Sequence, residues 1–231
     1  MVRWLTFDCY GTLVDWRTGI AQGIEAVAPG HSARLLPFYY QQEAAVQAEG
    51  FRPYREVLAE ALRRAAAEAA ITLAVGADLV LPDGLPSWPV FADVGPALSR
   101  LRESGWKLAV LSNIDPDLFA GTRQRLPVRI DAVVTALDVG SYKPAHGHFL
   151  TFAHSYQPQV HLHVAQSWFH DIVPAHELGI PAIWINRLGE RDDPSIAAAV
   201  LPDLETLPET VSRLEAEGQH HRAQHQERAR Q

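Results

Sequence analysis

Short apolar runs alternate with helical stretches along most of the chain. Five runs are rich in apolar and β-prone residues and end at polar or turn-forming residues, so they predict buried strands. The predicted strands are Arg3–Phe7, Lys107–Leu111, Ala132–Thr135, His161–Ala165 and Ala182–Asn186. The stretches with helical spacing between them are Gly95–Ser104, Pro116–Leu126, His146–Tyr156 and Val173–Leu178. This alternation predicts an α/β fold, in which a doubly wound, Rossmann-like parallel sheet carries helices on both faces.

One segment near the N-terminus breaks the alternation. Residues 15–88 are rich in alanine and glutamate, have helical spacing in Pro37–Glu49 and Tyr54–Ala70, and contain no convincing strand. We therefore predict a helical cap over residues 15–88, inserted into a core made of residues 1–14 and 89–218. Residues 219–231 contain no apolar side chain apart from two alanines, which predicts a disordered tail.

The composition of the chain argues against several kinds of binding partner. The chain has 231 residues, with 20 Lys and Arg against 27 Asp and Glu, and its net charge of −7 opposes binding to nucleic acid. No apolar run approaches the roughly 18 residues that a membrane span needs, and the first residues do not resemble a secretion signal. The single cysteine, Cys9, cannot form an internal disulfide. We therefore expect a cytoplasmic protein that acts on a small molecule, without nucleic acid or membrane contacts.

Polar side chains follow four of the predicted strands. They are Asp8, the pair Ser112 and Asn113, Lys143, and the pair His170 and Asp171. Because the carboxyl ends of parallel strands meet at one edge of a sheet, we expect these side chains to converge. Each residue alone could cap a helix or lie in a turn. Together they predict an active site in which a carboxylate serves as nucleophile next to a cation.

The segments that contain these residues resemble a known superfamily. In chain order they read FDCYGTLVD, LSN, SYKP and HDIVPAHELGIPAIWINR. Their order and spacing resemble the four sequential motifs of the haloacid dehalogenase superfamily, from Leu5 to about Asn186. The resemblance implies a doubly wound core, a helical cap that closes over the site, and Asp8 as the nucleophile.

Tyr10 indicates the branch of the superfamily. Phosphatase branches place a second aspartate two residues after the nucleophile and use Mg²⁺, whereas this chain has Tyr10. With an ordinary pKa of about 10, a tyrosine is a poor replacement for an acid–base carboxylate. The D-x-Y-G-T form resembles the 2-haloacid dehalogenases, which use no metal. It implies hydrolysis at C2 of a small 2-substituted carboxylic acid, through an ester on Asp8, with no cofactor.

The resemblance also implies a role for the residues that surround Asp8. Thr12 would orient the Asp8 carboxylate, and Lys143 would keep it ionised. Asp171 would hold Lys143 in place or help to activate the hydrolytic water. These three side chains and Asp8 are therefore the predicted catalytic group.

Four further residues are expected to bind the substrate. Ser112 and Asn113 would bind the substrate carboxylate, Tyr10 would line the site, and Ser167 retains part of the serine-rich stretch that precedes the fourth motif in typical 2-haloacid dehalogenases. The resemblance further implies a homodimer as one candidate assembly.

The chain departs from the dehalogenases in the cap. Those enzymes use a cap arginine to receive the halide, and the expected segment, Pro37–Gln42, has none, so we consider Arg52 and Arg55. Several motifs resemble azetidine-2-carboxylate hydrolase more closely, which implies C–N hydrolysis of a cyclic amino acid as an alternative. In that reaction His170 could donate a proton to the leaving amine; a structural role for this histidine is equally open.

The strand-end residues also fit a phosphatase or a silent module. A Mg²⁺-dependent phosphatase would use Asp8 and Asp171 as metal ligands. A catalytically silent binding module would have no need for Asp8, Lys143 and Asp171 together, which argues against it. Dehalogenation remains the leading expectation.

Overall fold

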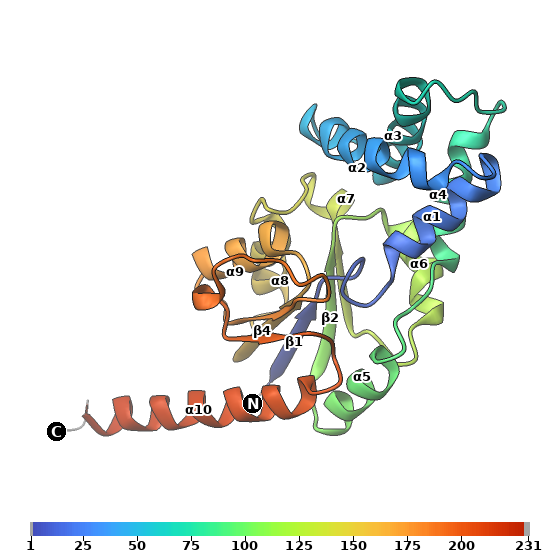
Figure 1. The fold of residues 1–231 in the computed structure, drawn as a ribbon. Helices are drawn as coiled ribbons and strands as arrows, with labels where there is room; N and C mark the ends of the chain where they lie inside the picture. The colour runs from blue at the N-terminus through green and yellow to red at the C-terminus, as the bar shows by residue number, and fades with distance from the viewer. Residues whose placement is uncertain (1, 229–231) are drawn as a thin grey trace.

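The structure, a computed structural model, describes residues 2–228, with side chains up to residue 220. Its centre is a six-stranded sheet in the order β3-β2-β1-β4-β5-β6, and every neighbouring pair of strands is parallel (Figure 1). The strands are β1 (Arg3–Phe7), β2 (Lys107–Ser112), β3 (Ala132–Thr135), β4 (Val160–Ala165), β5 (Ala182–Ile185) and β6 (Ala199–Leu201). The predicted doubly wound parallel sheet is confirmed.

The strand order places the predicted site at a switch in the winding of the sheet. From β1 the chain builds outward through β2 and β3, and then crosses back to place β4 on the other side of β1. In parallel sheets of this kind, ligands bind beyond the carboxyl ends of the strands at which the order reverses. Asp8 follows β1 directly, so it lies at this crevice.

The sheet separates two hydrophobic layers because successive strand residues point to opposite faces. Leu5 and Phe7 pack with one set of helices, and Trp4 packs with the other. The first set is α5 (Val94–Glu103), α6 (Pro116–Arg125) and α10 (Leu207–Arg228). The second set is α7 (Ala136–Val139), α8 (Gly147–Tyr156) and α9 (Val173–Glu177).

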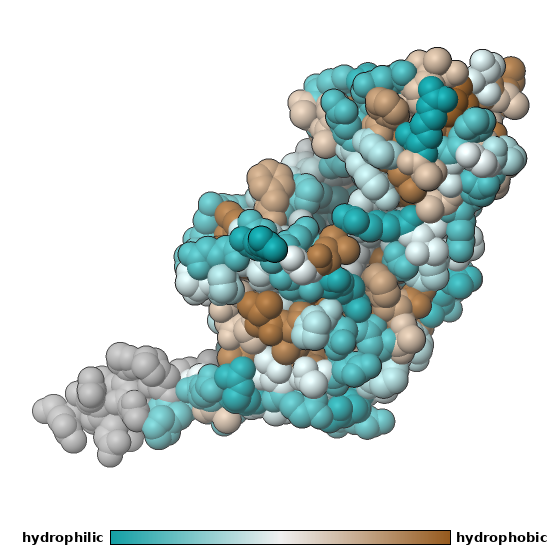
Figure 2. Space-filling view, in the orientation of Figure 1, coloured by the Kyte–Doolittle hydropathy of each residue, from teal (hydrophilic) through white to brown (hydrophobic). Residues whose placement is uncertain are grey.

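A helical unit lies above the carboxyl edge of the sheet (Figure 1). Its elements are α1 (Trp16–Val27), α2 (Ser32–Ala48), α3 (Tyr54–Glu68), η1 (Ala77–Leu79), α4 (Val80–Gly84) and η2 (Leu85–Ser87). Alanines such as Ala61 and Ala65 are buried in α3, which lets α2 and α3 pack closely. The molecule narrows between this cap and the core (Figure 2).

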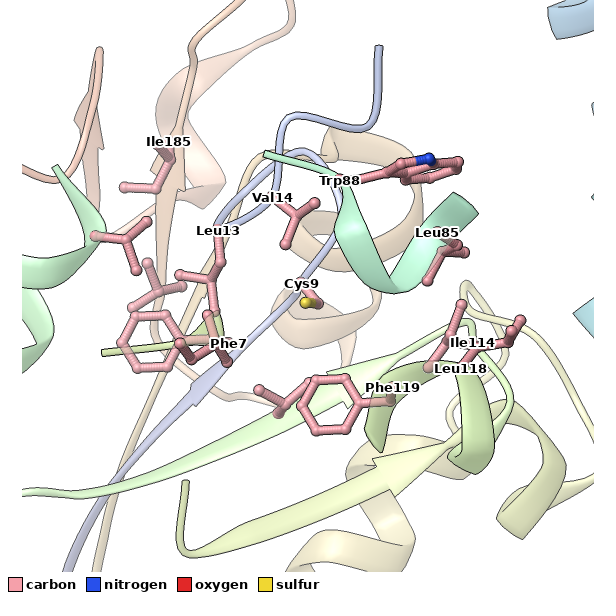
Figure 3. Packing of buried hydrophobic residues seen from close by; sticks show 14 of the residues in the cluster. Phe7, Cys9, Leu13, Val14, Leu85, Trp88, Ile114, Leu118, Phe119 and Ile185 are labelled. Atoms are coloured by element: carbon pink, nitrogen blue, oxygen red, sulfur yellow. The ribbon is translucent and has the colours of Figure 1, made fainter. Parts of the chain in front are cut away.

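The two connections to the cap run side by side. Val14 and Val90 form an antiparallel bridge, and the backbone N–H of Phe91 donates to the carbonyl of Leu13 at 3.0 Å. Trp88 packs beside them, next to Cys9 and Leu85 (Figure 3). The chain therefore leaves and re-enters the core at one place, so the cap is anchored at a single two-stranded hinge.

Some elements differ from the expectations. Helix α2 begins at Ser32 and contains Pro37. The helical spacing in the sequence predicted that this helix would begin at Pro37, and proline is tolerated best in the first turn of a helix. Strand β6 was not anticipated because it has three residues. The predicted disordered tail is wrong for residues 219–228, which continue α10; this stretch lacks Gly and Pro and is rich in helix-forming residues. Residues 229–231 lie outside the described part.

Within residues 2–228, the structure contains no helix with the length and apolar character needed to cross a membrane. Exposed apolar side chains on the face shown in Figure 2 are scattered among polar ones.

The contact between α1 and the hinge gives a stability prediction. A Cβ atom on Gly19 would lie 2.3 Å from Cγ of Trp88, which is far closer than van der Waals contact. We expect Gly19→Ala to lower the free energy of unfolding by about 1–3 kcal/mol through overpacking. Gly95→Ala is the matched control, because its nearest neighbour, Pro127 Cγ, is 3.5 Å away. Urea unfolding of both variants tests this, and equal stability of the two would contradict it.

Candidate active site

The turn after β1 holds the Asp8 carboxylate in place. The backbone N–H of Asp8 donates to the carbonyl of Val164 at 3.0 Å, which extends the pairing of β1 with β4 by one residue. Gly11 has a φ of 106°, a conformation that favours glycine, and so the chain turns back on itself. As a result the Thr12 hydroxyl donates to Asp8 Oδ2 at 2.8 Å. Asp8 is 7% exposed.

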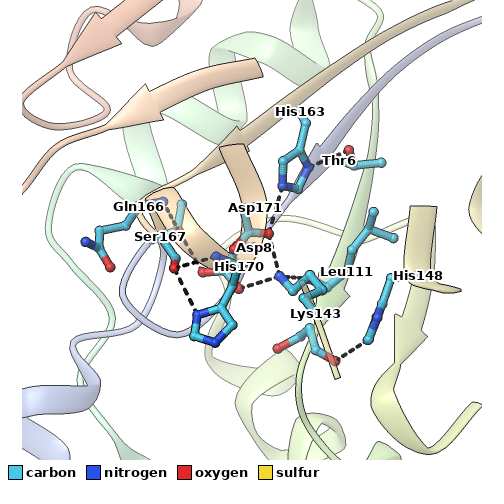
Figure 4. Close-up of polar contacts among 12 residues, drawn as sticks. Thr6, Asp8, Leu111, Lys143, His148, His163, Gln166, Ser167, His170 and Asp171 are labelled. Carbon is cyan, nitrogen blue, oxygen red and sulfur yellow. Dashed lines mark hydrogen bonds and ion pairs between the residues drawn. The ribbon is translucent and has the colours of Figure 1, made fainter. Parts of the chain in front are cut away.

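Lys143 lies between the two aspartates. Its Nζ donates to Asp8 Oδ1 at 3.0 Å, to Asp171 Oδ1 at 2.6 Å and to the Leu111 carbonyl at 2.8 Å (Figure 4). An ammonium group has three protons, so all three are used. The side chain is buried with its charge neutralised.

Burial and charge act in opposite directions on this group. Burial raises the pKa of Asp8, and attraction to Lys143 opposes this rise. Burial would likewise raise the pKa of Asp171, but Lys143 and a hydrogen bond from His163 lower it to about 2. Burial would lower the pKa of Lys143, but the two carboxylates outweigh it and raise the pKa. Asp171 and Lys143 therefore form a firmly ionised pair beside a more readily protonated Asp8.

A chain of polar side chains supports Asp171 from behind. His163 Nε2 lies 3.0 Å from Asp171 Oδ1, and its Nδ1 lies 2.9 Å from the Thr6 hydroxyl. The same hydroxyl lies 2.8 Å from His161 Nε2, and burial lowers the pKa of His161 to about 3. Sequence reasoning missed this chain, although the i, i+2 spacing of the two histidines places them on one face of β4.

Ser112 and Asn113, at the end of β2, have different contacts. Asn113 accepts from the Lys143 backbone N–H at 2.7 Å and donates to the Lys143 carbonyl at 3.1 Å, so it fixes the loop that carries the lysine. Ser112 is buried and lines the cavity above Asp8. Both residues are brought to the site as expected, while substrate binding by them stays a prediction.

The two residues after Asp8 point in different directions. The Tyr10 hydroxyl lies 2.9 Å from that of Thr122, and burial raises the pKa of Tyr10 well above its usual range, so this phenol stays protonated. Cys9 packs among Phe7, Leu13 and the hinge residues (Figure 3), and burial raises the pKa of its thiol. Tyr10 lines the cavity, whereas Cys9 is a packed residue, as the sequence indicated.

The turn after β4 carries Ser167 and His170. The Ser167 hydroxyl accepts from the backbone N–H of His170 at 3.1 Å and lies 3.0 Å from its Nδ1, and so caps the short helical turn η3 (Trp168–Ile172). Burial lowers the pKa of His170, which favours a neutral ring at neutral pH. Both residues line the cavity. The predicted proton donation by His170 stays a prediction.

A cavity of about 600 Å³ separates Asp8 from the cap. Its floor comes from the core residues described above, and its roof comes from α1, α2 and the start of α3. The cap residues that line it are Trp16, Arg17, Tyr40, Glu43, Ala44, Gln47, Ala48 and Tyr54. Arg17 and Glu43 were not predicted as site residues, because the helical spacing of the cap does not show which of its positions face the core.

Arg52 and Arg55 do not line this cavity, so their proposed entry into the site is wrong. Arg52 pairs with Glu49 at 3.1 Å, and Arg55 pairs with Asp117 at 2.7 Å. Both are held in ion pairs away from the cavity.

The donor set near Asp8 does not fit Mg²⁺. Among the described residues, no group of three His, Cys, Asp or Glu side chains is placed to hold a metal ion. The ammonium group of Lys143 already bonds to one oxygen of each candidate carboxylate, Asp8 Oδ1 and Asp171 Oδ1. The predicted lack of a cofactor stays a prediction.

Comparison with known proteins identifies the family. A family model described as haloacid dehalogenase-like hydrolase matches residues 2–165. The chain belongs to the haloacid dehalogenase-like hydrolases. One relative within this family is the (S)-2-haloacid dehalogenase of Pseudomonas sp. (strain YL), 23% identical over 198 residues that cover 81% of this chain and 84% of the relative.

Solved structures of haloacid dehalogenase-like hydrolases share the fold. An L-2-haloacid dehalogenase matches with a TM-score of 0.83 and 25% identity, covering 91% of this chain and 99% of the other. The L-2-haloacid dehalogenase from Xanthobacter autotrophicus matches with a TM-score of 0.79 and 19% identity, over 92% and 99% of the two chains. The chain is therefore a hydrolytic enzyme that shares the fold of these structures.

The buried charges predict opposite effects of two substitutions on stability. Lys143→Met leaves two buried carboxylates without their cation, and we expect it to lower the free energy of unfolding by about 3–5 kcal/mol. Asp8→Asn keeps the pair of Lys143 and Asp171, and we expect it to raise stability. Urea unfolding at neutral pH measures both, and a Lys143→Met variant as stable as the parent would refute this account.

The gain from Asp8→Asn should depend on pH. When folding raises the pKa of a carboxyl group, the folded protein holds that proton more tightly than the unfolded chain does. The free energy of unfolding therefore falls as the pH rises from the ordinary pKa of the group to its raised pKa. For Asp8 the ordinary value is 3.8. The advantage of Asp8→Asn over the parent should therefore be smallest near pH 4 and grow toward neutrality. An advantage that shrinks with rising pH would contradict the raised pKa.

Proposed function

We propose that the protein hydrolyses small 2-substituted carboxylic acids at C2 through an ester on Asp8. The observation that carries this proposal is the position of the Asp8 carboxylate, at the floor of the cavity, with Lys143 on one oxygen and Thr12 on the other. Each oxygen retains a lone pair for attack. A carboxylate that is fixed beside a cation and faces a cavity has the requirements of a carbon nucleophile.

Dehalogenation is the leading form of this reaction. A relative named (S)-2-haloacid dehalogenase aligns over most of both chains, and a structure named L-2-haloacid dehalogenase shares the fold at 25% identity. In the proposed reaction a carboxylate oxygen of Asp8 bonds to C2 and the halide leaves with the electron pair of the broken bond. Arg17 is the described cap arginine that lines the cavity, and it is our candidate to receive the halide.

The second half of the reaction hydrolyses the ester. Water attacks Cγ of Asp8, the bond between Cγ and the ester oxygen breaks, and a 2-hydroxy acid leaves with an oxygen that came from Asp8. We assign activation of this water to His170 and Asp171. His170 lines the cavity, its Nδ1 lies 3.0 Å from the Ser167 hydroxyl, and in the tautomer with its proton on Nδ1 the ring has Nε2 as the acceptor for a proton of this water.

A second candidate is C–N hydrolysis of a cyclic amino acid such as azetidine-2-carboxylate. The observation in its favour is that the cap contributes a carboxylate, Glu43, to the cavity, where a substrate with a positively charged nitrogen would find a counter-ion. The step at C2 is the same, but the leaving amine stays attached to the product.

A substrate panel tests the proposal. Purified protein is incubated with L-2-chloropropionate, azetidine-2-carboxylate and an aryl phosphate, with EDTA or with Mg²⁺, and halide, the primary amine formed by ring opening, and phosphate are measured. We expect halide or the primary amine to form in EDTA, and neither to form in Asp8→Asn, because an amide oxygen is a poor nucleophile. Phosphate release that requires Mg²⁺, or turnover that survives in Asp8→Asn, would overturn the proposal.

The source of the product oxygen tests the ester directly. In a single turnover in H₂¹⁸O, with protein in excess over substrate, the ester route gives an unlabelled 2-hydroxy acid and places ¹⁸O in the peptide that contains Asp8. Direct attack of water on C2 gives a labelled product and an unlabelled peptide. Mass spectrometry of both molecules separates these outcomes, and the second outcome would exclude the Asp8 ester.

A further inference from the structure

Glu43 is a carboxylate in the roof of the cavity. It lies in α2, and its Oε1 accepts from the hydroxyl of Tyr54 and from Nε2 of Gln47, the latter at 3.4 Å. These contacts leave Oε2 without a protein partner among the described residues. The side chain lines the cavity that contains Asp8. It is therefore held by one oxygen, while the other is available to a ligand.

No cation of the described chain pairs with Glu43. Arg64 pairs with Glu49 and Glu60, Arg63 with Asp78, and Arg55 with Asp117. Arg17 lines the same cavity but forms no ion pair with Glu43. Burial raises the pKa of Glu43, and the hydrogen bond from Tyr54 offsets part of this rise. Glu43 is half-buried, and an ionised carboxylate that is partly withdrawn from water without a cation is unfavourable. A ligand that brings a positive charge would compensate it.

The surroundings of Glu43 suit a cation. The rings of Trp16, Tyr40 and Tyr54 line the same cavity, and aromatic faces attract cations. The rings of Trp16 and Tyr40 already contact one cation, because the Arg17 guanidinium lies 5.6 Å from the ring centre of Trp16 and 5.7 Å from that of Tyr40. The roof therefore combines a carboxylate with aromatic surface.

We propose that Glu43 binds a protonated nitrogen of the substrate, so that the cavity takes small carboxylic acids that carry an amine as well as the reacting C2 centre. This inference rests on the proposed function, which places C2 next to Asp8. The carboxylate of the substrate then faces Ser112 at the floor, and the ammonium group faces Glu43 at the roof. A substrate with a methyl group in place of the ammonium group leaves Glu43 uncompensated.

Equilibrium binding of matched 2-hydroxy acids tests this without any catalytic step. Isothermal titration calorimetry compares 4-amino-2-hydroxybutanoate with 2-hydroxypentanoate, which has a methyl group in place of the ammonium group. We expect the parent protein to prefer the amino acid by roughly 10- to 100-fold, the contribution of a charge-assisted hydrogen bond. We expect Glu43→Gln to remove this preference, because a neutral amide of the same shape does not attract a cation.

The control is Glu68→Gln, which removes the same charge from the cap at an exposed position outside the cavity. It should keep the preference of the parent protein. Equal binding of the two acids, no binding of either, or a preference that survives in Glu43→Gln would overturn the inference. Failure of the proposed function is recognised separately, by the absence of ¹⁸O from the Asp8 peptide, since neither acid in the titration has a leaving group.

Discussion

The buried ammonium group of Lys143 is the constraint on which the site depends. It links three strand ends, because it bonds to Asp8 after β1, to the Leu111 carbonyl in β2 and to Asp171 beyond β4. Two carboxylates at this depth would repel each other and lose their hydration without it. Further contacts serve to hold this cation in place: Asn113 fixes its backbone, and His163 holds Asp171. Lys143 thus holds one oxygen of the nucleophile while Thr12 holds the other, and its charge opposes the rise in the Asp8 pKa that burial causes.

The sequence predicted those site residues that come after the carboxyl ends of strands. Asp8, Lys143 and Asp171 come after apolar runs, and a parallel sheet brings such positions together whatever the rest of the chain does. The boundaries of β1 and β3 were predicted to the residue for the same reason, since each strand is a short apolar run between turns.

The parts that the sequence did not predict depend on packing between helices. Arg52 and Arg55 were expected in the site because the segment expected to supply an arginine has none, but their charges are held by nearby carboxylates at the surface. Glu43 is one of several glutamates in the cap, and its sequence context does not distinguish it from Glu68. The packing of α2 against α3 decides which of them faces the cavity, and periodicity does not resolve that choice.

The charge of the site bears on the kind of substrate. Asp8, Lys143 and Asp171 carry one net negative charge when all three are ionised, and Tyr10 stays protonated beside them. A substrate with a single negative charge meets less repulsion from this group than a dianion does. With Glu43 at the roof, the zwitterionic substrate that we propose would place its positive end at the roof and its carboxylate near the floor. Specificity would then reside in the cap, and the chemistry in the core that the cap covers.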